Sequence, residues 1–182
     1  MRLVVGITGA SGLIYAERLL RFLSTTKHAV DVIVSARARK INEQECGMDF
    51  AAFGFPLYAD DAGDVPSLSG SQRCDGGAVV PCSMATLGRI ASGVADTAIA
   101  RTADVFLKER RPLVLVVRES PYSLIHIRNM EQVTLAGAVV LPASPGFYTE
   151  PKTIEALVDT IVARVLDHLG VEHALCPPWT PP

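Results

Sequence analysis

Short continuous runs of apolar residues divide the chain, and glycine or polar residues follow each run. The first run, residues 3–7, is rich in β-branched residues and stops at the turn Thr8-Gly9-Ala10-Ser11-Gly12. A continuous apolar run of this length is typical of a strand covered on both faces. Comparable runs occur at residues 78–80, 112–117 and 138–141, and residues 30–34 form a similar run that Asp31 interrupts. The pattern therefore predicts five strands.

Between these runs, apolar residues recur at helical spacing. In residues 13–23 they fall on one face with charged residues between them, which predicts an amphipathic helix. Further helices are predicted over residues 36–46, before the glycine stop at Gly137, and from Pro151 onward. Because strands and helices alternate, we expect an α/β fold with a doubly wound parallel sheet, in a Rossmann- or flavodoxin-like three-layer arrangement.

The segment 47–77 interrupts this alternation. It is rich in glycine, serine, proline and aspartate. Because it is long for a plain connection, we expect it to be a functional or mobile loop.

Composition narrows the class of function. With 182 residues and a formal net charge of −2, the chain is expected to form one domain over residues 1–182 and to bind neither nucleic acid nor membranes. Its four cysteines form no C-x-x-C pair, which predicts no disulfide framework, no metal site and a cytoplasmic protein. The first apolar run is too short for a signal peptide or membrane span. Small-molecule chemistry is the better expectation.

The turn after the first strand is the first candidate site. Gly6, Gly9 and Gly12 are spaced by three, which lets backbone N–H groups approach a phosphate at the start of the next helix, with the Ser11 hydroxyl as a further donor. A tight turn with a helix cap is the alternative. Ser35, not an acidic residue, follows the second strand. This argues against NAD, whose ribose is usually held there by a carboxylate.

Polar residues also follow the third and fourth strands. Ser83 and Thr86 lie three apart at a predicted helix start, where they could cap the helix or bond a planar heterocycle. Cys82 is interpreted as a buried apolar residue and not as a nucleophile. The charged pair Arg118-Glu119 comes directly after the fourth run, at the strand edge where such sheets bind ligands.

Other residues are candidates for binding an anionic substrate. Arg101 and Lys108 lie seven apart on a predicted helix, so they share a face and could serve one anion site; a solvated helix face is the alternative. Tyr148 lies in the turn after the fifth run. Arg164 flanks the apolar stripe of the last helix and, taken alone, is expected to reach water.

In order and over nearly the whole chain, these motifs resemble those of the UbiX-type flavin prenyltransferases. The segments that carry the resemblance are Thr8-Gly9-Ala10-Ser11-Gly12, Pro81-Cys82-Ser83-Met84-Ala85-Thr86-Leu87, Lys108-Glu109-Arg110-Arg111-Pro112-Leu113, Arg118-Glu119 and Pro145-Gly146-Phe147-Tyr148. The resemblance implies a homo-oligomer, usually a dodecamer, that joins a dimethylallyl group from dimethylallyl phosphate to reduced FMN. A partner decarboxylase of the UbiD type would use the prenylated FMN.

The resemblance also implies roles for individual residues. Those expected to bind FMN are Gly9, Ala10, Ser11, Ser35, Ser83, Met84, Ala85, Thr86 and Arg118. Those expected to bind the prenyl phosphate are Arg101, Lys108, Tyr148 and Arg164. Ser11 and Glu119 resemble the acid–base pair that closes the new ring. Glu45 is counted with the catalytic residues and, like Arg101, is expected to reach the prenyl phosphate from the assembled site.

Two positions depart from the family pattern. Ala36 stands where the family commonly has lysine, and Gly63 falls where some members have a tryptophan in the prenyl pocket. These changes could alter the prenyl donor or mark a paralogue with a different reaction. Trp179, near the end of the chain, is a candidate aromatic lid.

Three other functions compete with this interpretation. An FMN-dependent cysteine decarboxylase would share the fold, but typically has a catalytic histidine and a Pro-Ala-Ser-Ala-Asn-Thr segment. A non-catalytic flavin-binding subunit is the second. An NADP-dependent reductase would need Tyr148 and Lys152 on one helix face, and Pro151 between them argues against that geometry.

Overall fold

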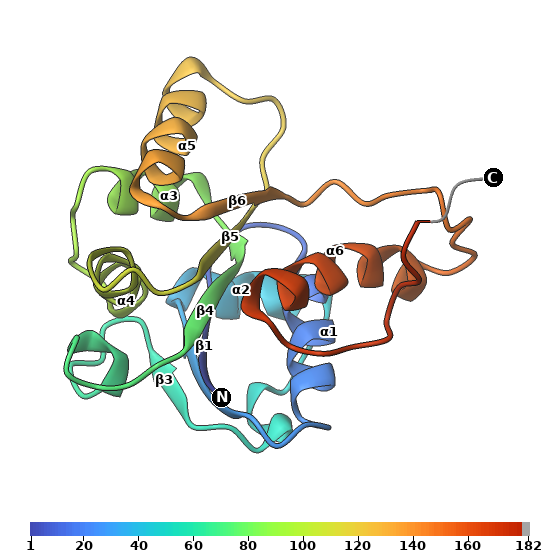
Figure 1. Ribbon diagram of the computed structural model, residues 1–182, viewed down its shortest axis with the longest axis horizontal. Helices are drawn as coiled ribbons and strands as arrows, with labels where there is room; N and C mark the ends of the chain where they lie inside the picture. Colours follow the sequence, from blue (N-terminus) through green and yellow to red (C-terminus); the bar gives the residue numbers. More distant parts are fainter. Residues whose placement is uncertain (180–182) are drawn as a thin grey trace.

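A computed structural model describes residues 1–179 of the chain and shows a parallel sheet between two layers of helices (Figure 1). Six strands lie in the order β3-β2-β1-β4-β5-β6. Their bounds are β1 Arg2–Ile7, β2 Ala29–Val34, β3 Leu57–Ala59, β4 Gly76–Cys82, β5 Leu113–Val117 and β6 Val139–Pro142. All neighbouring strands pair in parallel. Their carboxyl ends therefore meet at one edge of the sheet.

Helices cover both faces of the sheet. Their bounds are α1 Leu13–Leu23, α2 Ala36–Glu45, α3 Met84–Ala91, α4 Ala98–Lys108, α5 Leu124–Ala136 and α6 Ile154–Leu169. Figure 1 shows α1, α2 and α6 on one face, and α3, α4 and α5 on the other. The buried side chains form one apolar cluster on each face, and consecutive residues of β1 alternate between them. The predicted doubly wound three-layer fold is confirmed.

The strand order locates the ligand crevice. The chain winds outward from β1 through β2 to β3, then returns to the middle and winds the other way through β4, β5 and β6. The connections leave β1 and β4 toward opposite sides, so a crevice opens between the carboxyl ends of these two strands.

The prediction of five strands is wrong by one. β3 lies within segment 47–77 and pairs with β2, where Val32 is opposite Leu57. It has only three residues, none of them fully buried, and short 3₁₀ turns at Phe50–Phe53 and Pro66–Leu68 flank it. An edge strand that is partly solvated lacks the long apolar run by which the other strands are predicted.

A close contact between helix and sheet fixes one side of the crevice. A Cβ at Gly77, in β4, would lie 2.5 Å from the Phe106 ring of α4 and 2.7 Å from the carbonyl oxygen of Val4. Only glycine therefore lets α4 pack this closely on β1 and β4.

The outer surface of α5 exposes several large apolar side chains beside charged and polar ones. Val133 is the one residue of this helix that is buried, whereas Leu124, Ile125 and Leu135 are 61%, 70% and 80% exposed. Within residues 1–179, no helix is long and apolar enough to cross a membrane.

Candidate functional site

A cavity of about 350 Å³ lies at the carboxyl ends of the central strands, and we call it the strand-end cavity. Residues expected to bind FMN or to act in catalysis form much of its wall: Gly9, Ser35, Ser83, Met84, Ala85, Thr86 and Glu119. The remaining lining residues are Thr8, Arg37, Asp60, Arg89 and Thr97. The volume is within the range of small-molecule sites, roughly 300–1,000 Å³.

Thr8 ties the ends of β1 and β4 together beneath this cavity. Its hydroxyl donates to the carbonyl oxygen of Pro81 at 2.7 Å and accepts from the Ser83 N–H at 2.8 Å. Thr8 is only 2% exposed, so water cannot replace these bonds easily. Sequence analysis did not single out Thr8, because nothing in its immediate neighbourhood shows that it faces β4.

The start of α3 forms one wall and presents unpaired donors. The Ser83 hydroxyl accepts from the Thr86 N–H at 3.3 Å and lies 3.1 Å from the Thr86 hydroxyl, so the capping interpretation of this serine is confirmed. Within residues 1–179, the N–H groups of Met84 and Ala85 have no protein acceptor. Both residues line the cavity, which makes this helix start suited to an anion.

The start of α1 is different, because a carboxylate already occupies it. One Glu45 oxygen accepts from the N–H groups of Gly12 at 2.9 Å and Leu13 at 3.1 Å. Burial alone would raise the pKa of Glu45, but hydrogen bonds from Ser11, Gly12 and Leu13 and the charge of Arg118 together lower it. Backbone N–H groups at the Ser11 turn were expected to bind a phosphate, but those of Gly12 and Leu13 already donate to an ionised side chain.

The Ser11–Glu45 contact also changes the expected pairing of catalytic residues. Glu45 reaches Ser11 within one chain, whereas the family resemblance implies that it reaches the prenyl phosphate in the assembled site. Glu119 lines the strand-end cavity instead, where one of its oxygens accepts from the Ser120 N–H at 3.0 Å. Tyr15, on α1, is a further residue near Arg118. Burial raises the pKa of Tyr15, and the positive charge of Arg118 partly offsets this rise. Tyr15 was not predicted.

Gly9 is required where the turn meets α2. A Cβ at this position would lie 2.4 Å from Cγ and 2.7 Å from Cβ of Arg37. The Arg37 stem therefore packs directly on the glycine. Ser35 caps α2 by accepting from the Ala38 N–H at 3.1 Å, so the cap interpretation holds for this serine as well, although it also lines the cavity.

Asp60 places a carboxyl group at the same edge, after β3. It accepts from the Ile99 N–H at 2.8 Å at the start of α4. Burial raises the pKa of Asp60, against the effect of hydrogen bonds from Ile99 and Thr97. Because β3 itself was not predicted, sequence analysis had no reason to place Asp60 here.

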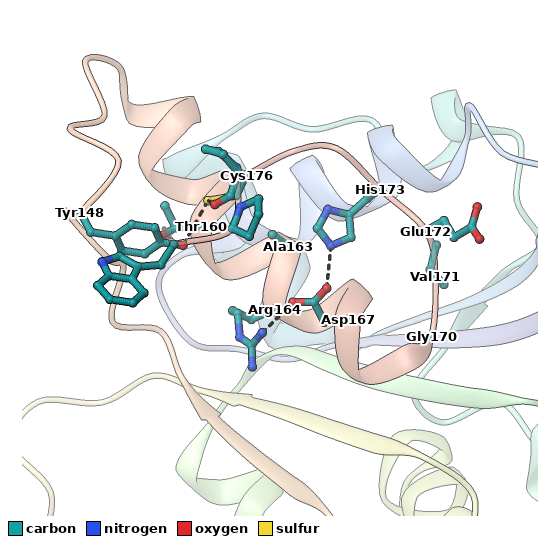
Figure 2. A pocket seen from close by; sticks show the side chains of 13 residues that line it. Tyr148, Thr160, Ala163, Arg164, Asp167, Gly170, Val171, Glu172, His173 and Cys176 are labelled. Atoms are coloured by element: carbon teal, nitrogen blue, oxygen red, sulfur yellow. Dashed lines mark hydrogen bonds and ion pairs between the residues drawn. The ribbon is translucent and has the colours of Figure 1, made fainter. Parts of the chain in front are cut away.

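A second, larger cavity of about 1,040 Å³ lies between α6, the turn before it and the C-terminal segment; we call it the tail cavity (Figure 2). Tyr148, Arg164 and Trp179 line it. The Tyr148 hydroxyl lies 3.6 Å from Cys176 Sγ, and this contact is the main reason why the pKa of Tyr148 is raised. Trp179, the candidate lid, borders this cavity and is 64% exposed.

Asp167 links two side chains of the tail cavity. One carboxylate oxygen accepts from Arg164 Nη1 at 2.7 Å, and the other lies 3.0 Å from His173 Nε2, as the dashed lines in Figure 2 show. The Arg164 side chain is 58% exposed. The expectation that it reaches water is correct, but it also faces the cavity.

Arg101 and Lys108 do not meet at one anion site within the chain. Arg101 Nη1 pairs with Asp104 at 2.7 Å, and Lys108 pairs with its neighbour Glu109. Arg101 lines a small cavity that shares Asp60 and Thr97 with the strand-end cavity. Spacing places the two cations on one helix, but no common pocket lies beneath them in the part of the chain that is described.

Comparison with known proteins adds the family to this geometry. The family model described as Flavoprotein matches residues 1–166. A flavin prenyltransferase UbiX from Methanocaldococcus jannaschii is 41% identical over 182 residues, which cover 98% of each protein. The corresponding protein from Thermoplasma acidophilum is 42% identical and covers 98% of this chain and all of its own length. This chain belongs to the UbiX flavin prenyltransferase family.

Solved structures support the same assignment. AnUbiX (PadA1), determined in complex with FMN and dimethylallyl pyrophosphate, superposes with a TM-score of 0.95 at 41% identity and covers 99% of this chain and 97% of its own. A dodecameric FMN-dependent UbiX-like decarboxylase from Escherichia coli O157:H7 gives a TM-score of 0.95 at 39% identity, with both chains covered fully. The cysteine decarboxylase TvaF reaches a TM-score of 0.66 at 18% identity, so that similarity concerns the fold alone.

Within this family framework, several alternative roles find no support in the geometry. Burial raises the pKa of Cys82 to about 12, so its thiol stays protonated and is not a nucleophile. Tyr148 and Lys152 both precede α6 and do not share a helix face, so the reductase geometry is absent.

Gly63 falls where some family members have a tryptophan. A Cβ at Gly63 would meet no atom within 4 Å, and this residue lines neither named cavity. Among residues 1–179, no cluster of three metal-binding side chains occurs.

Proposed function

We propose that this protein is a flavin prenyltransferase that transfers the dimethylallyl group of dimethylallyl phosphate to reduced FMN. One observation carries the proposal: in a chain about 40% identical to UbiX relatives over nearly its full length, residues from three of the family motifs, together with Ser35 from a fourth loop, converge on one cavity. A cavity at the switch point of a doubly wound sheet is the usual place for such a ligand.

In this proposal the FMN phosphate lies at the start of α3. The free N–H groups of Met84 and Ala85, with the hydroxyls of Ser35, Ser83 and Thr86 around them, supply donors to an anion. Gly9, with the Arg37 stem packed on it, lines the cavity beside the β1 turn, and we assign Gly9 and the adjacent Ala10 to flavin contact. Ser11 and Arg118 lie next to Glu45. When bound, reduced FMN supplies the nucleophilic ring atoms that accept the prenyl group.

The donor phosphate is assigned to the tail cavity and to cations of a neighbouring copy. Tyr148 and Arg164 line that cavity, whereas Arg101 and Lys108 lie on α4 and line neither named cavity. In an oligomer, these α4 cations would complete the site of another copy. Their charges would neutralise the phosphate as it leaves the allylic carbon.

Two groups are assigned to proton transfer. Glu119, at the wall of the strand-end cavity, acts as the base that removes the flavin proton when the new ring closes. The ionised Glu45 holds the Ser11 hydroxyl by a hydrogen bond, which orients Ser11 as the second member of the proton-transfer pair.

We further propose a homododecamer that passes prenylated FMN to a UbiD-type decarboxylase. The support for assembly is the group of exposed apolar side chains on α5, Leu124, Ile125, Ile127 and Leu135, together with the dodecameric Escherichia coli structure. Exposed patches of this kind usually mark interfaces.

The direct test is anaerobic incubation of the protein with reduced FMN and dimethylallyl phosphate, followed by mass spectrometry of the extracted flavin. We expect the mass of FMN plus one dimethylallyl unit. A parallel reaction with dimethylallyl pyrophosphate, the ligand of AnUbiX, identifies the preferred donor. Unchanged FMN with both donors, from protein that binds FMN, would contradict the transferase assignment.

A decarboxylase is the second candidate, because the similar structures include a phenylacrylic acid decarboxylase from Aquifex aeolicus, with 39% identity and a TM-score of 0.89. Incubation of the purified protein with phenylacrylic acid and FMN, without any partner enzyme, separates the two functions. Release of carbon dioxide by this protein alone would favour the second candidate over the first.

A further inference from the structure

The strand-end cavity contains two arginines, and they differ in their partners. Arg89 Nε lies 3.1 Å from an Asp96 oxygen, and Arg89 Nη1 donates to the Ala85 carbonyl oxygen at 3.4 Å. Arg37 lines the same cavity. Within residues 1–179, its guanidinium has neither a hydrogen bond nor an ion pair in this structure. Arg37 is therefore the cavity's uncommitted positive charge.

Packing fixes the stem of this arginine at the β1 turn. Cβ, Cγ and Cδ of Arg37 all lie within 2.9 Å of the position that a Gly9 Cβ would occupy. The side chain therefore rests on the bare backbone of Gly9. Ser35 caps the same helix immediately before it, so both the backbone and the stem of Arg37 are held beside the cavity.

The charges around the cavity favour an anion near Arg37. The carboxyl groups at its wall are Asp60, whose pKa is raised by burial, and Glu119, which accepts from the Ser120 N–H. Ala36, the residue before Arg37, supplies no charge. The open N–H groups of the α3 start lie at the same cavity. A dianionic phosphate there would gain donors from both sides of the crevice.

We propose that Arg37 binds the phosphate of FMN and so makes this site select the phosphorylated flavin over riboflavin. This inference rests on the proposed flavin site but not on prenyl transfer. Arginine is suited to the role, because its planar guanidinium can donate two parallel hydrogen bonds to phosphate oxygens.

The test compares FMN with riboflavin, which lacks the phosphate, in wild-type protein and in Arg37→Gln. Glutamine keeps the Cβ, Cγ and Cδ atoms that pack on Gly9 and removes only the guanidinium. We expect Arg37→Gln to weaken FMN binding by about 10- to 150-fold, the value of a hydrogen bond to a charged group. Riboflavin affinity should stay the same. Arg37→Lys, which keeps the charge, should retain part of the FMN affinity.

Arg39→Gln is the matched control. Arg39 lies on the same helix, but its guanidinium stacks 5.6 Å from the centre of the Phe50 ring, and it does not line the cavity. Its substitution should change neither affinity. The proposal is overturned if Arg37→Gln weakens both flavins equally, or if it weakens neither.

These outcomes are separate from the proposed reaction, because binding is measured without a prenyl donor. A protein that selects FMN through Arg37 but never forms prenylated FMN would refute the transferase assignment alone. A transferase whose FMN affinity is unchanged in Arg37→Gln would refute this inference alone.

Discussion

The strand-end cavity and the tail cavity differ in how far this chain builds each of them. At the strand ends, the buried Thr8 joins β1 to β4, and serine caps hold the starts of α2 and α3. In the tail cavity, Tyr148 and Trp179 are 55% and 64% exposed. The first site is preorganised, whereas the second is formed by solvated side chains that substrate or a neighbouring copy can rearrange.

This difference matches the demands of the two proposed ligands. A bound flavin needs fixed donors, because preorganised groups lose little entropy when the ligand arrives. A prenyl phosphate must enter and its phosphate must leave, which an open site allows. Substitutions at the two cavities should therefore affect different steps.

The largest expected effect separates binding from chemistry at the strand ends. In Glu119→Gln, turnover should fall by about 10²- to 10⁴-fold, the usual contribution of a general base. FMN affinity should not change, because the residue is assigned to proton transfer. Rates of prenylated FMN formation and FMN titrations measure the two quantities.

Glu43→Gln, an exposed change on α2 that lines neither named cavity, serves as the control and should behave as wild type. Full activity in Glu119→Gln would remove this residue from the mechanism and leave Ser11 with Glu45 as the remaining proton-transfer pair.

A smaller effect is expected at the tail cavity. Arg164→Gln should lower kcat/KM for the prenyl donor by about 10- to 100-fold, through the loss of a charged hydrogen bond to phosphate. FMN affinity should be retained. Steady-state kinetics with varied donor concentration test this expectation.

Arg21→Gln is a close match for comparison, since the side chains of Arg21 and Arg164 are 59% and 58% exposed and each pairs with a carboxylate on its own helix. An equal loss in both variants would show that the effect at Arg164 is not specific to the donor site.

The smallest expected effect concerns the carboxylate at the start of α1. The pKa of Glu45 is lowered from 4.5 in the folded protein, so its ionised form stabilises the fold above that pH. This contribution is lost as the pH falls through the folded-state pKa. At pH 7, Glu45→Gln should lower the free energy of unfolding by about 1 kcal/mol, as for loss of a helix cap.

Urea unfolding of both proteins, repeated down to about pH 3.5, checks the sign, because the difference should shrink at low pH as the carboxylate takes up a proton. Glu43→Gln, an exposed change on the same helix, should show no such difference. A gap that widens with acid would contradict the capping role.

Sequence alone predicted the buried parts of this fold well. Strands covered on both faces are largely apolar, so β1, β2, β4, β5 and β6 could be located from their runs, although β2 contains the buried Asp31, which pairs with Arg2 at 3.0 Å. β3 could not, because a three-residue edge strand is recognisable only by its pairing with β2. The strand-end residues were also predictable, since parallel strands bring their carboxyl ends to one edge.

Contacts between distant segments were out of reach of the sequence. The bond from Gly12 N–H to Glu45 joins residues 33 apart, and no local pattern shows that α2 ends over the β1 turn. Thr8 matters because it bonds the end of β4, and Arg37 matters because its stem packs on Gly9. The spacing of Arg101 and Lys108 correctly suggested a shared helix, but it carries no information about the partners that each finds.

The carboxylate of Glu45 also makes the α1 side and the α3 side of the crevice differ in how well they attract an anion. Two helix starts face the region between β1 and β4, and each could attract a negative group. Because Glu45 holds the amides of Gly12 and Leu13, an anionic ligand between these two helix starts meets open amides at α3. A long ligand with a phosphate at one end is then expected to point that end toward α3 and the other end toward Ser11.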